Sequence, residues 1–279
     1  MYSNPIKSCL WFDGQANEAA QYYCSIFPNA KILEVHPLVT TFELSGTKFM
    51  GLNGGPMFKF TPSFSFTVFC ESIDQTNELW DKLIVGGKAL MPIDKYEWSA
   101  RYGWLEDKYG LSWQITLAET EAETLKIVPS MLFTDTLFGK AEEAINFYAS
   151  IFGNSSTTLL VPFPEEDENA GKVMYSEFKL SNNDLIAMDG AGAHGFAFNE
   201  AVSLVVDCDT QEEIDYYWNK LTEGGEESMC GWLKDKYGVS WQIVPAITGK
   251  LLMDPEKGER VMQVVMKMVK IDLDKMLNA

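Results

Sequence analysis

Apolar residues recur along the chain with two spacings, which predict short strands and amphipathic helices. In the first segment the predicted strands lie at 6–12, 32–35, 40–44 and 48–53, and a predicted helix at 16–27 separates the first two. Gly54, Gly55 and Pro56 end the series. This segment therefore predicts one unit with the order strand, helix, strand, strand, strand (βαβββ).

The same order of elements begins again at Phe64. Residues 64–68 alternate as a strand does, and Ser72 and Gln75 have the spacing of a capping box, which opens a helix. Gly86 and Gly87 end this helix, and further strands follow it. The pattern therefore predicts a second βαβββ unit directly after the first.

One stretch of thirteen residues organises the whole chain. Gly103–Ile115 (GWLEDKYGLSWQI) returns as Gly231–Ile243 (GWLKDKYGVSWQI), and only two positions differ. Each copy has the pattern of a hairpin, with a polar Asp-Lys-Tyr-Gly turn between two apolar strands. The chain is therefore a tandem duplication, joined by a charged stretch at 118–126, with predicted domains at 1–122 and 123–279.

The second copy follows the first element by element. Leu132–Asp135 is aligned with Leu10–Asp13, Met188–Gly190 with Leu52–Gly54, and Val202–Val206 with Phe64–Val68. The first copy has a longer insert at 88–102, and the second has a longer acidic loop around 165–168. The second copy therefore predicts two further βαβββ units.

A C-terminal extension follows the second copy. Asp254 and Pro255 have the types expected at the start of a helix. Val261, Val265 and Met268 then recur at helical spacing, beside a second row of Met262, Met266 and Val269. This stripe predicts an amphipathic helix that docks on the rest of the protein.

Composition excludes several classes of function. A chain of 279 residues with 46% hydrophobic content is long enough for two folded domains. Its net charge of −18 is the wrong sign for nucleic acid or an anionic membrane surface, because both attract basic proteins. The sequence has no apolar run of about 18 residues and no apolar signal segment near its start. We therefore expect a cytoplasmic protein without nucleic-acid or membrane partners.

The five cysteines argue against a disulfide framework or a zinc cage. They are odd in number, and no two have the CxxC spacing. Cys70 and Cys208 occupy matching repeat positions at the ends of apolar strands. We interpret both as small core residues rather than reactive thiols.

Several phrases of the sequence resemble one protein family. Trp11–Gly14 (WFDG), Asn53–Pro56 (NGGP), Asn199–Ser203 (NEAVS) and Gly231–Gln242 are similar to the PhnB-like branch of the vicinal oxygen chelate superfamily, which includes glyoxalase I, bleomycin-resistance proteins and extradiol dioxygenases. The resemblance covers nearly the whole chain, twice, and includes the tail at Val261–Asp272. It implies an α+β fold of two tandem glyoxalase-like modules. In this fold, paired βαβββ units form curled mixed sheets with a ligand inside.

The resemblance also implies where a metal would bind. Catalytic relatives hold a divalent metal in the cup through His, Gln or Glu, and Gln114 and Gln242 stand here where relatives have the ligand Glu. The predicted cup strands offer no His or Glu, and His36 and His194 lie in loop-like stretches. Neutral amides and hydroxyls bind divalent metals poorly, so we expect no metal and no cofactor.

Members of this branch are often labelled 3-demethylubiquinone-9 3-methyltransferase domains. A methyltransferase that uses S-adenosylmethionine usually has a glycine-rich turn from a strand into a helix. Here Gly51–Gly55 follows a predicted strand but leads to Pro56 and another strand. The residues therefore do not support methyl transfer.

The residues favour a mostly apolar pocket with a few polar groups. Alternation places Ser112 with Gln114, and Ser240 with Gln242, on one face of the closing strand, and Trp113 and Trp241 on the other. The candidate ligand-binding residues are Trp11, Asn53, Trp104, Gln114, Asp189, Ser203, Trp232 and Gln242. We predict a small-molecule-binding protein without a catalytic metal. The alternative is a metal-dependent lyase, isomerase or dioxygenase-type enzyme of the same superfamily, so enzymatic activity stays open here.

The duplication also predicts how the protein assembles. Relatives with a single repeat commonly form dimers, so the two halves are expected to pack like the subunits of a homodimer. The fused chain then supplies both subunits by itself. We therefore expect a monomer that mimics a homodimer, with weaker self-association as the alternative.

Overall fold

The computed structural model describes residues 1–118 and 124–279 of the chain. The predicted join at 118–126 falls partly outside these residues. The predicted domain boundary between residues 122 and 123 falls wholly outside them.

The first repeat folds into the two predicted βαβββ units. The first unit comprises β1 (Ile6–Phe12), α1 (Ala16–Ile26), β2 (Lys31–Val35), β3 (Val39–Leu44) and β4 (Thr47–Asn53). The second comprises β5 (Phe64–Cys70), α2 (Ile73–Leu83), β6 (Lys88–Tyr96), β7 (Ser99–Glu106) and β8 (Ser112–Leu117). The Ser72 hydroxyl accepts a hydrogen bond from the Gln75 backbone N–H at the start of α2, as the capping box predicts.

The second repeat has the same order of elements. Its first unit comprises β9 (Lys126–Phe133), the 3₁₀ turn η1 (Asp135–Leu137), α3 (Ala141–Ile151), β10 (Ser156–Pro162), β11 (Val173–Leu180) and β12 (Asn183–Asp189). Its second comprises β13 (Val202–Cys208), α4 (Gln211–Leu221), β14 (Glu226–Glu227), β15 (Trp232–Lys234) and β16 (Ser240–Pro245). The repeat in the sequence is therefore a repeat of structure.

The strands form two eight-stranded mixed sheets. Sheet A has the order β14-β15-β16-β13-β1-β4-β3-β2, and sheet B has the order β10-β11-β12-β9-β5-β8-β7-β6. The predicted α+β fold of paired βαβββ units is confirmed. The two units in one sheet come from different repeats, because β1 pairs with β13 and β5 pairs with β9, both antiparallel.

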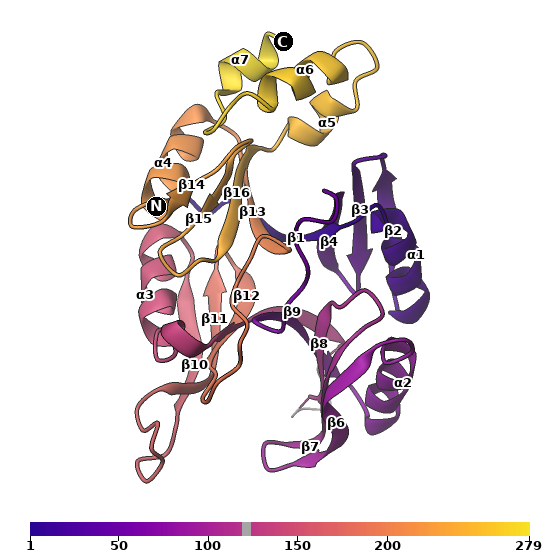
Figure 1. Cartoon of the computed structure of the whole chain (residues 1–279), viewed down its shortest axis with the longest axis vertical. Coiled ribbons are helices and arrows are strands. Elements are labelled where there is room, and N and C mark those ends of the chain that lie inside the picture. The colour runs from indigo at the N-terminus through magenta and orange to yellow at the C-terminus, as the bar shows by residue number, and fades with distance from the viewer. Residues whose placement is uncertain (119–123) are drawn as a thin grey trace.

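Within each repeat, the helix-covered faces of the two sheets pack together. Tyr23 on α1 contacts Trp113 on β8, with ring centroids 5.5 Å apart, and Tyr148 on α3 contacts Trp241 on β16 at the same distance. Figure 1 shows the first repeat on the right and the second on the left, with α1 and α2 on one outer side and α3 and α4 on the other. The other face of each sheet is free of helices and faces inward, between the repeats.

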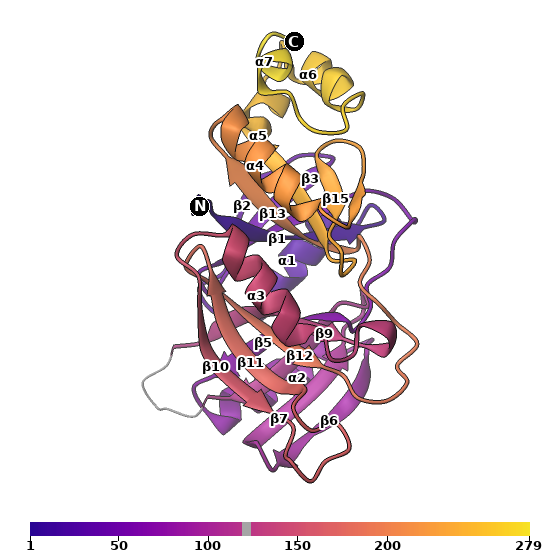
Figure 2. The ribbon, with the colours of Figure 1, turned by 90° about the vertical axis from the view of Figure 1, so that its left-hand side faces the viewer.

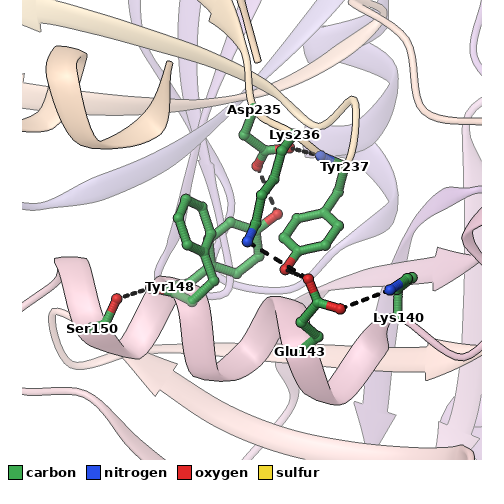
Figure 3. A network of polar contacts seen from close by, with 8 residues as sticks. Lys140, Glu143, Tyr148, Ser150, Asp235, Lys236 and Tyr237 are labelled. Carbon is green, nitrogen blue, oxygen red and sulfur yellow. Dashed lines mark hydrogen bonds and ion pairs between the residues drawn. The ribbon is translucent and has the colours of Figure 1, made fainter. Parts of the chain in front are cut away.

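The repeated hairpin is held by a buried aspartate. The Asp235 carboxylate accepts hydrogen bonds from Tyr148 Oη at 2.7 Å and Trp241 Nε1 at 2.8 Å, and from the backbone N–H groups of Tyr237 and Val239. Figure 3 shows how this network joins α3 to the turn before β16. Asp107 makes the equivalent four bonds in the first repeat, to Tyr23, Trp113, Tyr109 and Leu111. In each repeat, the aspartate of the hairpin therefore joins the second βαβββ unit to the helix of the first.

The C-terminal extension is less helical than its sequence predicts. It forms three short helices, α5 (Thr248–Leu252), α6 (Gly258–Val265) and α7 (Leu273–Leu277). The helix that carries the predicted apolar stripe therefore ends at Val265. The helix ends there because the Met268 and Val269 carbonyl groups accept hydrogen bonds from the backbone N–H groups of Cys230 and Gly231. The prediction of one continuous helix through Met268 is therefore wrong.

The predicted docking of this extension is confirmed. Val261, Val265, Ile271 and Met276 form a buried cluster, with Cys230 packed against it. Figure 2 shows the extension at the sheet A end of the molecule, next to α4. No helix among residues 1–118 and 124–279 is long and apolar enough to cross a membrane.

Candidate ligand-binding site

The helix-free faces of the two sheets form two equivalent sites. We call them cup A, centred on Cys9, Ser203, Ser240 and Gln242, and cup B, centred on Ser130, Ser65, Ser112 and Gln114. The ladders place these residues side by side: Ser203 pairs with Cys9 and with Ser240, and Ser65 pairs with Ser130 and with Ser112. In cup A, β1 of the first repeat pairs with β13 of the second, and in cup B, β5 of the first repeat pairs with β9 of the second. Each cup is therefore formed by strands of both repeats.

In cup B the polar side chains bond to one another. Gln114 Nε2 donates to Ser65 Oγ at 2.8 Å, and Tyr102 Oη donates to Gln114 Oε1 at 2.8 Å. Trp104 Nε1 donates to Ser112 Oγ at 2.7 Å. These side chains are buried except for Trp104, which is partly exposed. The floor of cup B is thus a network that satisfies itself.

Cup B is also filled by the insert of the first repeat. Tyr102 is 8% exposed, and it contacts the rings of Tyr96 and Trp98 at centroid distances of 5.5 and 5.6 Å. The longer segment Lys88–Tyr102, which is shorter in the second repeat, therefore supplies the tyrosine that bonds to the Gln114 amide.

Cup A has fewer internal bonds. Gln242 Nε2 donates to Ser203 Oγ at 2.9 Å, and both residues lie against the Cys9 thiol. Burial raises the pKa of the Cys9 thiol to about 12, and hydrogen bonds to Gln242 and Ser203 offset only part of this rise. Cys9 is therefore a protonated, neutral group at physiological pH.

Two polar groups of cup A have no partner. Ser240 is 1% exposed, and its Oγ makes no hydrogen bond within the described part of the chain. Trp232 is partly exposed, and its indole N–H likewise makes no bond to any described residue. Their equivalents in cup B, Ser112 and Trp104, bond to each other. Cup A therefore has an indole N–H and a serine hydroxyl without partners, whereas the equivalent groups of cup B are hydrogen-bonded to each other.

Aromatic side chains wall cup A. The rings of Trp11 and Trp232 meet edge to face at 5.8 Å, and Phe58 meets Trp11 in the same way at 5.0 Å. Trp11 Nε1 donates to the Gly55 carbonyl at 2.7 Å, and a Cβ on Gly54 would lie 2.2 Å from the Trp11 ring. The loop after β4 thus folds closely over Trp11, and only glycine fits at residue 54.

Trp11 has no tryptophan equivalent in cup B. Phe12 pairs with Asn53, and Phe133 pairs with Asp189, so the structure equates Phe133 with Phe12 and Leu132 with Trp11. The predicted alignment of Leu132–Asp135 with Leu10–Asp13 is therefore wrong by one residue. Buried core contacts of both phenylalanines, with Tyr109 and Tyr237, determine this register.

Two predicted site residues lie on the other face of the sheets. Asn53 Oδ1 accepts a hydrogen bond from the Ala16 backbone N–H at the start of α1. Asp189 accepts bonds from the backbone N–H groups of Gly139 and Ala141, before and at the start of α3. Both residues share the side of their sheet with the core residues Phe12 and Phe133. Their position favours a structural role at the helix N-termini.

The other predicted residues come together as two groups. Trp11, Trp232, Gln242 and Ser203 lie in cup A, and Trp104 and Gln114 lie in cup B. Trp113 and Trp241 are fully buried on the helix side, as alternation predicts. Cys9 and Phe58 were not among the predicted site residues. The position of Cys9, two residues before Trp11 in one strand, is a signal that could have found it.

The donor atoms of the cups do not fit a divalent metal. Cup A offers a neutral thiol, an amide and two hydroxyls, and none of these is an anionic or imidazole ligand. His36 and His194 lie in loops, and His194 Nε2 is bonded to the Ala191 carbonyl. Among residues 1–118 and 124–279, no three His, Cys, Asp or Glu side chains are grouped to hold a metal. Such a set would not repay the dehydration of a divalent ion.

Two cavities lie away from the floor of cup A. One of about 50 Å³ lies on the helix-free face of sheet B, beside Ser130 of cup B, and is lined by Lys126, Val128, Glu177 and Asp184 among others. It is far below the roughly 300 Å³ of a small-molecule pocket. The other, of about 290 Å³, is lined by Pro28, Glu71 and Leu125 among others, outside both cups.

The chain matches one family and several solved structures. The model of the 3-demethylubiquinone-9 3-methyltransferase family matches residues 4–116 and again 125–244. The PhnB protein from Bacillus cereus is 36% identical over 40% of this chain and 98% of that chain, with a TM-score of 0.39. No curated protein matches the chain.

Two other solved structures match most of the chain. Glyoxalase I from Zea mays covers 87% of this chain and 93% of its own, at 13% identity and a TM-score of 0.54. A dioxygenase-like protein from Bacillus subtilis covers 95% of this chain and 90% of its own, at 9% identity and a TM-score of 0.50. These likenesses confirm the fold of the vicinal oxygen chelate superfamily, with two glyoxalase-like modules.

Proposed function

This chain belongs to the 3-demethylubiquinone-9 3-methyltransferase family, and we propose that it is a small-molecule-binding protein that uses no catalytic metal. The ligand would sit on a helix-free sheet face, between the two repeats. The observation that carries this proposal is the buried polar cluster of Cys9, Ser203, Ser240 and Gln242, which lies beneath the tryptophan wall. A mostly apolar site with a few fixed polar groups is the usual form of a ligand pocket.

The chemistry of the floor separates binding from catalysis. Cys9 is neutral at physiological pH because burial raises its pKa to about 12, so it is a poor nucleophile. The other floor groups are an amide and two hydroxyls, and none of these acts as an acid or base near neutral pH. The floor therefore suits recognition of a ligand better than proton transfer or hydrolysis.

Methyl transfer is not supported, although the family name includes it. Gly51–Gly55 spans the end of β4 and the loop over Trp11, and the next element is β5 rather than a helix. The chain therefore lacks, at this turn, the helix N-terminus that a methyl-donor cofactor would use.

A metal-dependent enzyme of the same superfamily is the competing function, and metal addition distinguishes the two. We expect Zn²⁺, Ni²⁺, Mn²⁺ and Fe²⁺ each to leave the melting temperature of chelator-treated protein nearly unchanged. A metal at a hundredfold excess over its Kd would stabilise the native state by about 2.7 kcal/mol. Differential scanning calorimetry measures this shift.

Binding itself is tested with a neutral flat probe. We expect 2-naphthol to bind the metal-free protein saturably and to quench tryptophan fluorescence, with the same Kd in the presence of EDTA. A stoichiometric metal that raises the melting temperature by several degrees, or probe binding that requires a metal, would favour the enzyme. Absence of saturable binding by the probe would remove the basis for a cup-bound ligand of this chemistry.

A further inference from the structure

The two cups are related by the repeat, so the protein contains its own comparison. The ladders equate Trp232 with Trp104, Ser240 with Ser112, Gln242 with Gln114, Ser203 with Ser65 and Cys9 with Ser130. The two cups therefore share the positions of these five residues, and they can be compared group by group.

Three substitutions remove hydrogen-bonding side chains from cup A. The sequence repeat aligns Cys230 with Tyr102, and the ladders equate Val205 with Thr67 and Val244 with Thr116. In cup B, Tyr102 bonds to Gln114, Thr67 bonds to Ser130, and Thr116 bonds to Ser99. Cup A thus retains the central amide as Gln242 but lacks the tyrosine that bonds to this amide in cup B.

The consequence is an unpaired hydroxyl beneath an unpaired indole. Native proteins rarely leave a buried polar group without a partner, because such a group loses its hydrogen bonds to water and gains none in return. The Ser240 hydroxyl is 1% exposed and unpartnered within the described chain, and the free Trp232 N–H lies on the same sheet face. In cup B the equivalent pair closes at 2.7 Å.

We propose that cup A alone takes the ligand, that Trp232 Nε1 and Ser240 Oγ bind it, and that cup B is a structural copy filled by Tyr102. This inference rests on the function proposed above and assigns it to one of two sites. The ligand class is a neutral, flat, largely apolar molecule with one hydroxyl or carbonyl group. Its oxygen would accept from the Trp232 N–H and bond to the Ser240 hydroxyl.

The walls and charges of cup A define this class. Trp11, Trp232 and Phe58 offer edges and faces of aromatic rings, which favour a flat apolar ligand. The charged side chains on β1, β13 and β15 are already paired. Lys7 bonds to Asp207 at 2.8 Å, and Lys234 bonds to Glu200 at 2.9 Å. An ionic ligand would therefore lose its hydration without gaining a free counter-charge.

Matched variants of the two cups test the assignment. Ser240→Ala and Trp232→Phe each remove one polar group from cup A, and Ser112→Ala and Trp104→Phe make the same changes in cup B. Each full-length variant is titrated with 2-naphthol and with naphthalene, which has the same rings but no hydroxyl. Urea midpoints of all four variants check that each one folds.

We expect the two cup A variants to weaken 2-naphthol binding about tenfold each and to leave naphthalene binding nearly unchanged. The cup B variants should keep the native affinity for both probes, and their urea midpoints should fall because Trp104 and Ser112 lose their shared bond. Weaker 2-naphthol binding in the cup B variants, with no change in cup A, would overturn the assignment while leaving the proposed function intact. Equal affinity of all four variants for both probes would also overturn it. Should a serine variant fail to fold, the phenylalanine variant of the same cup decides the outcome.

Discussion

At the scale of single residues, two buried aspartates explain why the hairpin motif recurs so closely. Asp235 is 3% exposed and accepts four hydrogen bonds, two from side chains and two from backbone groups of its own turn. Around it lie Tyr237, which bonds to Glu143, and Lys236 (Figure 3). The Lys236 ammonium group lies 4.4 Å from the centroid of the Phe147 ring. The Asp, Tyr and Trp of the motif are therefore linked physically, and a change in one leaves the others without partners.

Removal of this carboxylate should weaken folding strongly. Asp235→Ala leaves the Trp241 indole, the Tyr148 hydroxyl and two backbone N–H groups unpaired, so we expect a loss of roughly 3 kcal/mol or more in the free energy of unfolding. The control is Glu143→Ala, because Glu143 is exposed and its bonds to Lys140 and Tyr237 are solvated. That change should cost under about 1 kcal/mol. Urea denaturation of both variants measures the difference.

The stability that Asp235 contributes should also depend on pH. Burial raises the pKa of Asp235 above its usual value, although hydrogen bonds from Trp241 and Tyr148 oppose the rise. A carboxyl group with a raised folded-state pKa contributes its full stability below the unfolded pKa of about 3.9, and loses it as pH rises through the folded value. The stability difference between the native protein and Asp235→Ala should therefore shrink as pH rises from about 3.5. A difference that grows with pH would contradict this direction.

At the scale of elements, glycine pairs determine how closely each helix end approaches its hairpin. Gly86 and Gly224 follow α2 and α4 with φ of 76°, a left-handed conformation that favours glycine. A Cβ on the next residue would lie 2.1 Å from a backbone carbonyl oxygen, that of Glu106 for Gly87 and that of Lys234 for Gly225. The Gly-Gly motif therefore ends the helix and also lets the turn lie against β7 or β15.

A single methyl group at this position should be costly. Gly225→Ala places a Cβ against the Lys234 carbonyl, and relief requires the backbone to move, so we expect a loss of about 1–3 kcal/mol. Gly249→Ala is the control, because it lies in α5 with no atom within 4 Å of the added Cβ. That change should be neutral or stabilising by up to about 1 kcal/mol. Thermal denaturation of the two variants compares them, and equal melting temperatures would refute the close-contact argument.

At the scale of the whole molecule, the two repeats share both sheets. Ile6–Leu10 pairs with Val202–Val206 in sheet A, and Phe64–Phe69 pairs with Lys126–Met131 in sheet B. The buried apolar residues of both repeats form one cluster, and each cup needs strands from both repeats. The predicted likeness to a homodimer thus has a structural basis in two shared ladders.

Cleavage between the repeats should therefore leave one particle. A protease site introduced within residues 119–123 allows the chain to be cut, and the shared ladders should hold the fragments together without a covalent link. Light scattering should give a monomer mass near 31.4 kDa for both the intact and the cut protein. Fragments that separate under native conditions would mean that the ladders do not hold the repeats together, and a doubled mass would contradict the predicted monomer.

Local patterns determined the elements and their repetition. Periodicity and capping residues predicted the four βαβββ units, because each helix and strand is specified by neighbours a few residues away. Alternation also placed Gln114 and Gln242 opposite Trp113 and Trp241. The family resemblance then supplied the curled sheets, which the structural likenesses confirm.

Only the tertiary structure decided which units share a sheet and which polar groups find partners. Strand pairing of β1 with β13 joins residues about 200 positions apart, and no local pattern encodes that choice. The end of α6 likewise depends on the hairpin N–H groups that capture Met268 and Val269. Ser240 and Ser112 stand in nearly identical motifs, yet Ser112 accepts a hydrogen bond from Trp104, whereas Ser240 has no partner in the described chain and Trp232 instead meets the Trp11 ring. The hydrogen-bond partners of a residue depend on which side chains the fold places next to it, and the type of the residue alone does not determine them.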